Sequence, residues 1–162
     1  MLREGDRIPD VTLTGPEGRP VRLRDLAGDR ALVVYFYPKD ETLVCTAQAC
    51  SFRDLHAEFL AAGAVVVGIS GDPPASHAGF SAKHRLPFPL LSDESGEARR
   101  AFDVKPFLGF HPGRVTFVAD RSGVIRLAYV SQLRARPHVD RALEVVRALA
   151  SGDRVSGAAE GR

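Results

Sequence analysis

The fold of this chain is decided by residues 31–70, ALVVYFYPKDETLVCTAQACSFRDLHAEFLAAGAVVVGIS. The segment begins at residues 31–37 with a continuous run of apolar, β-branched and aromatic side chains, which is typical of a strand buried on both faces. Apolar residues then recur at helical spacing over residues 45–63, and Gly63 favours the end of a helix there. Because a second buried run follows at residues 64–70, the segment predicts two parallel strands joined by a helix in a right-handed crossover.

The segments on either side extend this unit into a larger sheet. Residues 11–23 alternate in polarity around a Gly-Pro-Glu-Gly turn and predict a hairpin at the N-terminal edge. Downstream, the pattern predicts a turn and helix (71–86), a short strand (88–93), a short helix (93–104), a hairpin around DRSG (114–120 and 124–130) and an amphipathic helix that begins near Pro137 (137–150). Parallel strands followed by a hairpin indicate an α/β chain of the thioredoxin-like fold, with a mixed central sheet flanked by helices and an N-terminal β-hairpin extension.

Length and composition are those of an ordinary globular chain. The 162 residues suffice for one domain, which we place at residues 1–150, followed by a flexible tail at 151–162. Charged residues make up 26%, and the net charge of +2 is too small and too dispersed to indicate a nucleic-acid or membrane partner. Because the apolar runs are too short to span a bilayer and the N-terminus has no apolar signal region, we expect a cytoplasmic protein.

The two cysteines of the chain, Cys45 and Cys50, lie in the first predicted helix. Chemistry in open α/β sheets gathers beyond the carboxyl ends of the parallel strands, and the loop at residues 38–44 lies there. Cys45 follows in the first helical turn, where unpaired N–H groups and the helix dipole favour a thiolate over a thiol. Thr42 is placed to cap the helix or to direct its hydroxyl at the sulfur, and Pro38 to stiffen the approach.

The spacing of the two cysteines does not suit a static disulfide. In an α-helix, residues five apart are separated by about 7.5 Å along the axis and about 140° around it, so their Cα atoms are about 8.6 Å apart. A disulfide requires less than about 7 Å between Cα atoms. The bond can therefore form only after the first turns unwind, which indicates a redox pair whose oxidised and reduced forms differ in shape.

The stretch YPKDETLVCTAQACSFRD (37–54) resembles the active-site segment of the peroxiredoxins, most closely the bacterioferritin comigratory protein (peroxiredoxin Q) group. The family pattern is a proline, a threonine and a cysteine at the spacing of Pro38, Thr42 and Cys45. The resemblance continues through VVVGISGDPPASHAGFSAKHRLPFPLLSD and GRVTFVADRSGVIR, and covers roughly residues 5 to 150.

This resemblance implies a thiol-dependent peroxidase of the atypical 2-Cys type. Cys45 would attack hydrogen peroxide or an organic hydroperoxide and become a sulfenic acid. Thr42 would hydrogen-bond the peroxide, and Arg114 would stabilise the thiolate and the transition state. Cys50 would resolve the sulfenic acid as an intramolecular disulfide, which thioredoxin or a similar dithiol reductant would reduce. The resemblance implies no metal and no organic cofactor.

The chain departs from this group in one place. Leu43-Val44 stands where the group commonly has Pro-Gly between the threonine and the cysteine. The N–H of Val44 remains available to the substrate, and the two apolar side chains lead to the hypothesis that organic hydroperoxides are preferred. Because the cysteine pair is local, no partner subunit's thiol is needed, and the sequence is compatible with a monomer or a dimer.

Simpler interpretations of the same residues remain open. Cys45 could be an inert buried thiol, Cys50 a packed cysteine with an external thiol as resolver, and Arg114 a surface arginine. Asp40 and Glu41 would disfavour a thiolate if they pointed inward, so we expect both in solvent. A zinc site is weakly indicated because no second ligand pair accompanies the cysteines. We expect surface or helix-face positions for the five histidines, His56, His77, His84, His111 and His138.

Two other functions compete with the peroxidase. A thioredoxin-like disulfide oxidoreductase normally uses C-x-x-C, whereas four residues separate the cysteines here. A non-catalytic thioredoxin-fold binding module would need no reactive thiol. Insulin reduction would identify the first, and an ordinary ionisation of Cys45 would favour the second.

Overall fold

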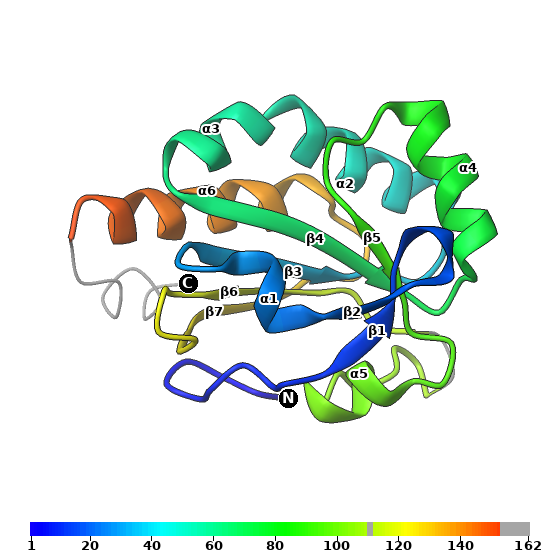
Figure 1. Ribbon diagram of the computed structural model, residues 1–162, viewed down its shortest axis with the longest axis horizontal. Coiled ribbons are helices and arrows are strands. Elements are labelled where there is room, and N and C mark those ends of the chain that lie inside the picture. Colours follow the sequence, from blue (N-terminus) through cyan, green and yellow to red (C-terminus); the bar gives the residue numbers. More distant parts are fainter. Residues whose placement is uncertain (110–111, 153–162) are drawn as a thin grey trace.

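A mixed β-sheet forms the centre of the protein. In the computed structural model, which describes residues 1–109 and 112–152, seven strands pair in the order β2-β1-β5-β4-β3-β6-β7 (Figure 1). Strands β3, β4 and β5 are parallel, and the other neighbours are antiparallel. The strands are β1 (Thr12–Thr14), β2 (Pro20–Arg22), β3 (Ala31–Phe36), β4 (Ala64–Ser70), β5 (Leu90–Ser92), β6 (Val115–Ala119) and β7 (Ile125–Val130). The predicted parallel unit and both predicted hairpins are confirmed.

Helices cover both faces of this sheet, as predicted. One face carries α2 (Leu43–Asp54), α3 (His56–Ala61) and α6 (Arg136–Ala150), with α4 (Pro74–His84) at the end of the sheet where β3 and β4 finish (Figure 1). The other face carries the short helices α1 (Leu23–Ala27) and α5 (Glu97–Ala101). A 3₁₀ turn, η1 (Pro16–Gly18), joins β1 to β2. None of the helices in the described ranges is long and apolar enough to cross a membrane.

Strand β3 separates two hydrophobic cores. Each of its six residues is at most 5% exposed. Tyr35 packs under α2, where its ring stacks on Phe52 with centroids 4.6 Å apart, while Phe36 meets Phe102 and Phe117 on the opposite face. Burying a large apolar side chain contributes about 1.5–3 kcal/mol, so this strand fixes the position of the loop that follows it.

The predicted helix over residues 45–63 is two helices. It begins earlier, at Leu43, and is interrupted at Leu55, whose backbone angles (φ −104°, ψ 10°) are not helical. Gly63 follows the second helix with φ +79° and donates its N–H to the Leu60 carbonyl, so the predicted stop is confirmed. The helix predicted over residues 93–104 is limited to Glu97–Ala101, and Gly96 precedes it as the N-cap of α5. Most of the predicted tail, residues 153–162, lies outside the described residues.

Candidate active site

Cys45 lies where the sheet and α2 meet. Strand β3 ends at Phe36, and the loop that follows its carboxyl end leads directly into α2. Cys45 occupies the first turn of that helix and is 1% exposed, whereas Cys50, in the same helix, is partly exposed. Both are free thiols within one uninterrupted helix. A disulfide between them therefore requires the helix to unwind.

Arg114 approaches Cys45 from the neighbouring strand. It directly precedes β6, whose Val115 pairs with Phe36 of β3, so it lies at the carboxyl end of β3. Its Nη2 donates to the Cys45 Sγ at 3.2 Å, and its Nη1 donates to the Gln48 Oε1 at 2.6 Å. The side chain is 3% exposed, which excludes the surface position considered above. A buried cation on the sulfur favours the thiolate.

Two glutamines that the motif does not include hold this guanidinium. Gln48 follows Cys45 by one helical turn and therefore lies on the same face of α2, a spacing that the sequence could have revealed. Gln132 accepts the Arg114 backbone N–H through Oε1 at 2.9 Å and the Arg114 Nε–H through its carbonyl at 3.1 Å. Gln132 follows β7, and no sequence pattern connects it to the site.

Thr42 occupies the N-cap position of α2 but makes neither of the contacts considered from the sequence. Its backbone is extended (φ −81°, ψ 156°), yet its side chain makes no cap hydrogen bond and none to the sulfur. The hydroxyl instead donates to the Lys39 carbonyl at 2.8 Å. Since that hydrogen bond uses the proton, the exposed hydroxyl oxygen keeps its lone pairs. Pro38, half-buried, begins this loop directly after Tyr37.

The prediction that Asp40 lies in solvent is wrong. Asp40 is 4% exposed, and its carboxylate accepts hydrogen bonds from the Tyr37 hydroxyl (2.6 Å) and the Ser76 hydroxyl (2.8 Å) and contacts His77 Nδ1 (2.7 Å). Burial alone would raise the pKa of Asp40, but the hydrogen bonds from His77, Tyr37 and Ser76 outweigh it and leave the pKa below its ordinary value. Glu41 is exposed, as predicted.

His77 and Asp72 complete this buried network. His77 lies on helix α4 but is 4% exposed, so of the two positions expected for it, surface or helix face, the surface one is wrong. Its Nε2 faces the Leu91 carbonyl at 3.1 Å. Asp72 Oδ2 accepts the Asp40 N–H at 2.7 Å and the Ser70 hydroxyl at 2.8 Å. Among the described residues, Asp40, Asp72 and His77 could approach a metal ion together, but these atoms already bind one another and their neighbours. The network therefore serves to anchor the loop before α2 to α4.

A second arginine and a second buried histidine border the site. Arg99 of α5 donates to the Tyr37 carbonyl (2.9 Å) and the Gly113 carbonyl (3.0 Å), and so joins the loop after β3 to the residue before Arg114. Burial lowers the pKa of Arg99. His138 is fully buried on helix α6, so of the two positions expected for it, surface or helix face, the surface one is wrong. His111 lies outside the described residues.

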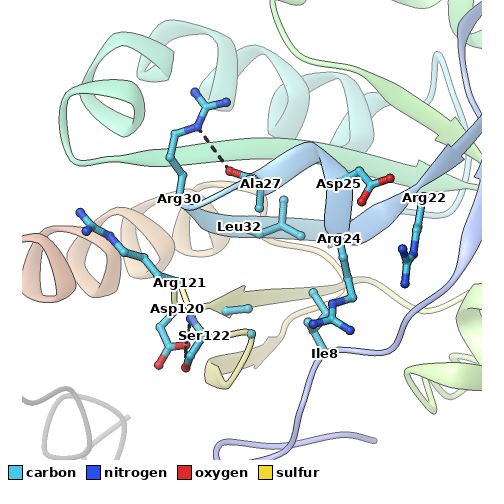
Figure 2. A pocket seen from close by; sticks show the side chains of 13 residues that line it. Ile8, Arg22, Arg24, Asp25, Ala27, Arg30, Leu32, Asp120, Arg121 and Ser122 are labelled. Atoms are coloured by element: carbon cyan, nitrogen blue, oxygen red, sulfur yellow. Dashed lines mark hydrogen bonds between the residues drawn. The ribbon is translucent and has the colours of Figure 1, made fainter.

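A hollow of about 600 Å³ lies at the other end of the sheet, where β3 begins and β6 ends (Figure 2). Ile8 and Leu32 contribute apolar side chains to a lining that is otherwise largely polar. In Figure 2 the guanidinium group of Arg30 extends upward, that of Arg121 to the left and that of Arg24 downward, so these cations do not converge on one point. The hollow shares no residue with the cysteine site and offers no comparable chemistry.

Comparison with known proteins shows the family to which this chain belongs. Residues 5–128 match the AhpC/TSA family. The chain is 48% identical over 149 residues to the chloroplastic peroxiredoxin Q of Sedum lineare, covering 91% of this chain and 80% of that protein. It is 45% identical over 148 residues to the chloroplastic peroxiredoxin Q of Arabidopsis thaliana, covering 91% and 68%.

Solved structures give the same result. The crystal structure of the peroxidoxin BcpB from Mycobacterium tuberculosis superposes with a TM-score of 0.85 at 38% identity, covering 92% of this chain and 99% of that one. A structure of Xanthomonas campestris peroxiredoxin Q superposes with a TM-score of 0.78 at 35% identity, covering 86% and 91%. The predicted thioredoxin-like fold and the resemblance stated from the sequence are both confirmed.

Proposed function

Because the chain belongs to the AhpC/TSA family and is a thiol-dependent peroxidase, we propose that Cys45 attacks the peroxide and that Cys50 resolves the product. The observation that carries this assignment is the hydrogen bond from Arg114 Nη2 to Cys45 Sγ at the N-terminus of α2. Cys50 has no such cation on its sulfur in the described contacts. The two thiols therefore lie in different environments, as their different roles require.

The first step is a displacement at oxygen. The Cys45 thiolate attacks the terminal peroxide oxygen, an S–O bond forms, the O–O bond breaks, and the leaving oxygen takes a proton to become water or an alcohol. The sulfur is oxidised to a sulfenic acid and the peroxide is reduced. Arg114 stabilises the charge that passes from sulfur to oxygen, and the free lone pairs of the Thr42 hydroxyl accept the peroxide O–H.

The second step requires α2 to unwind. Cys50 attacks the Cys45 sulfur, a disulfide forms and water leaves. The first turn of α2 is suited to opening because Leu43 is 87% exposed and the Thr42 side chain does not cap the helix. The break at Leu55 separates this movement from α3.

The proposals for the reductant, the cellular location and the range of peroxides rest on the sequence. We propose thioredoxin or a similar dithiol as reductant and the cytoplasm as location, although the curated relatives named above are chloroplastic proteins. Organic hydroperoxides are proposed as substrates beside hydrogen peroxide. One similar structure, 35% identical with a TM-score of 0.78, concerns the alkyl peroxide reduction activity of Xanthomonas campestris bacterioferritin comigratory protein.

One equivalent of hydrogen peroxide added to the reduced protein, followed by intact mass under non-reducing conditions, tests this assignment. The native protein should lose two hydrogen atoms, and Cys50→Ser should gain one oxygen atom. If both gained an oxygen, Cys50 would lose its role while Cys45 kept it. If neither mass changed within minutes, the assignment of Cys45 would fail.

A further inference from the structure

A histidine contacts the sulfur of Cys50. His84, the last residue of α4, places Nδ1 3.8 Å from the Cys50 Sγ and Nε2 3.6 Å from the Glu41 Oε1. We propose that His84, with the Glu41 carboxylate beside it, is the base that takes the proton from Cys50 and is thus a catalytic residue for disulfide formation. The proposal rests on the resolving role proposed for Cys50 above.

The His84 ring is held in this position from several sides. Its side chain is 19% exposed, and the edge of the Phe80 ring lies one helical turn away with centroids 5.1 Å apart. Arg53 of α2 donates Nη1 to the His84 carbonyl at 2.8 Å, which ties the end of α4 to the helix that carries Cys50. The contact between His84 and Cys50 therefore belongs to the packing of α4 on α2.

The two ring nitrogens have different surroundings. Nδ1 contacts the Cys50 Sγ, whereas Nε2 is buried without a hydrogen-bond partner in the described residues, and Glu41 Oε1 lies 3.6 Å from it. With the hydrogen of the neutral ring on Nε2, Nδ1 presents its lone pair to Cys50, and the nearby Glu41 charge stabilises the imidazolium once the proton has moved. Two cations lie close by: Arg53 on α2 donates to the His84 carbonyl, and the Lys83 Nζ lies 3.4 Å from the same Glu41 oxygen.

The loop before α2 is shaped to bring Glu41 to this place. Glu41 has a φ of +64°, in the left-handed region that residues with a side chain seldom occupy. The residue before it, Asp40, is fixed by Asp72 and His77. His77 and His84 are two turns apart on α4, so one face of that helix anchors the loop and contacts the resolving thiol.

The chemistry balances without an external oxidant. The Cys50 S–H bond breaks, the proton moves to His84 Nδ1, and the thiolate attacks the sulfenic sulfur of Cys45. The S–S bond forms and the S–O bond breaks; the hydroxide takes the proton back from the imidazolium and leaves as water. The Cys50 sulfur is oxidised and the Cys45 sulfur reduced. Since an ordinary thiol is only a few per cent ionised near pH 7, a base at Cys50 accelerates the step.

Alkylation of Cys50 by iodoacetamide in the full-length Cys45→Ser variant tests the base directly, independent of how fast α2 unwinds. We expect His84→Gln to slow alkylation about tenfold at pH 7. The deficit should vanish at strongly alkaline pH, where hydroxide removes the thiol proton without a protein base. Glu41→Gln, at an exposed position, should also lower the alkylation rate, but by less than His84→Gln. His56→Gln, which changes a half-buried histidine on α3, should leave the alkylation rate unchanged.

Single-turnover oxidation then separates this proposal from the one it rests on. In the otherwise native chain, His84→Gln should form sulfenic acid at the native rate and accumulate it at pH 7. A native protein that itself stops at the sulfenic acid would overturn the role of Cys50 and, with it, that of His84. If the native protein forms the disulfide, the alkylation rates decide on His84. Equal rates of Cys50 alkylation with and without His84→Gln at pH 7, or a rate difference that does not change with pH, would overturn the role of His84 alone.

Discussion

Arg114 Nη2 lies 3.2 Å from the Cys45 Sγ although the two residues are 69 positions apart in the sequence. The antiparallel pairing of β6 with β3 creates this contact, because it brings the start of β6 to the point where β3 turns towards α2. Gln48 and Gln132 accept two further hydrogen bonds from the guanidinium, so its orientation is fixed before a peroxide arrives. An oriented, buried cation does not need to reorganise during the reaction.

Replacing Arg114 should therefore slow the oxidation of Cys45 much more than it weakens the fold. We expect Arg114→Met to reduce the second-order rate with hydrogen peroxide about 10²-fold or more, and Arg114→Lys to give an intermediate rate, because lysine keeps the charge but not the fork. Stopped-flow measurement of sulfenic acid formation gives the rate. Arg126→Met, on β7 beside Asp120, is the matched control. A native rate in Arg114→Met would contradict the assignment.

Thr42 offers a second test because its side chain does not cap α2. A threonine that only capped the helix would cost about 1 kcal/mol of stability on removal and leave the chemistry alone. For Thr42→Val we expect the opposite result. Its midpoint of thermal unfolding should stay close to that of the native protein, and its peroxidase rate should be at least about tenfold lower. Thr42→Ser, which keeps the hydroxyl, should restore most of the rate. A stability loss without a rate loss would show that Thr42 acts only on the helix.

The strands were predictable because the polarity of successive side chains indicates which faces of a strand are buried. The run at residues 31–37 is apolar throughout because β3 is covered on both faces, and local turn residues gave both hairpins. The family pattern supplied Pro38, Thr42, Cys45 and Arg114, and the structure brings Arg114 to Cys45.

What the sequence did not reveal depends on contacts between distant residues. Asp40 looked like a loop carboxylate, and only the approach of α4 shows that it is buried against His77. His138 looked like a helix-face residue, yet it meets the Thr116 hydroxyl at 2.8 Å. Gln132 reaches Arg114 only because β7 returns beside β6. Side-chain pattern along one segment carries no information on such partners.

His138 should make the fold sensitive to mild acid. Burial lowers the pKa of His138 to about 4, below its ordinary value of 6.5, so the unfolded chain binds this proton more readily than the folded chain. The free energy of unfolding should therefore fall as the pH drops from about 6.5 to about 4, by about 3 kcal/mol from this group. Urea unfolding at several pH values measures the slope. His138→Gln should flatten it, and an unchanged slope would show that another group is responsible.

Asp40 should act at lower pH than His138 and should also reduce stability as the pH falls. Its pKa is depressed, so the stability that its carboxylate provides is complete above the ordinary value of about 3.9 and is lost as the pH falls through the lower folded value. Asp40→Asn should reduce stability at pH 7 by about 1–3 kcal/mol, because the amide replaces one of the two accepting oxygens in this buried network, and should remove part of the loss below pH 4. Equal stability of both proteins at pH 7 would show that the carboxylate contributes nothing.

The Leu43-Val44 pair should influence which peroxide reacts faster. Leu43 is 87% exposed and Val44 half-buried, so both present apolar surface at the first turn of α2. Each methylene that a bulky peroxide covers contributes about 0.8 kcal/mol, or about fourfold in rate. We expect Leu43→Pro/Val44→Gly to lower the ratio of the cumene hydroperoxide rate to the hydrogen peroxide rate several-fold. Leu60→Ser, at another exposed leucine on α3, should leave the ratio unchanged. If the double variant keeps the native ratio, the preference does not come from these side chains.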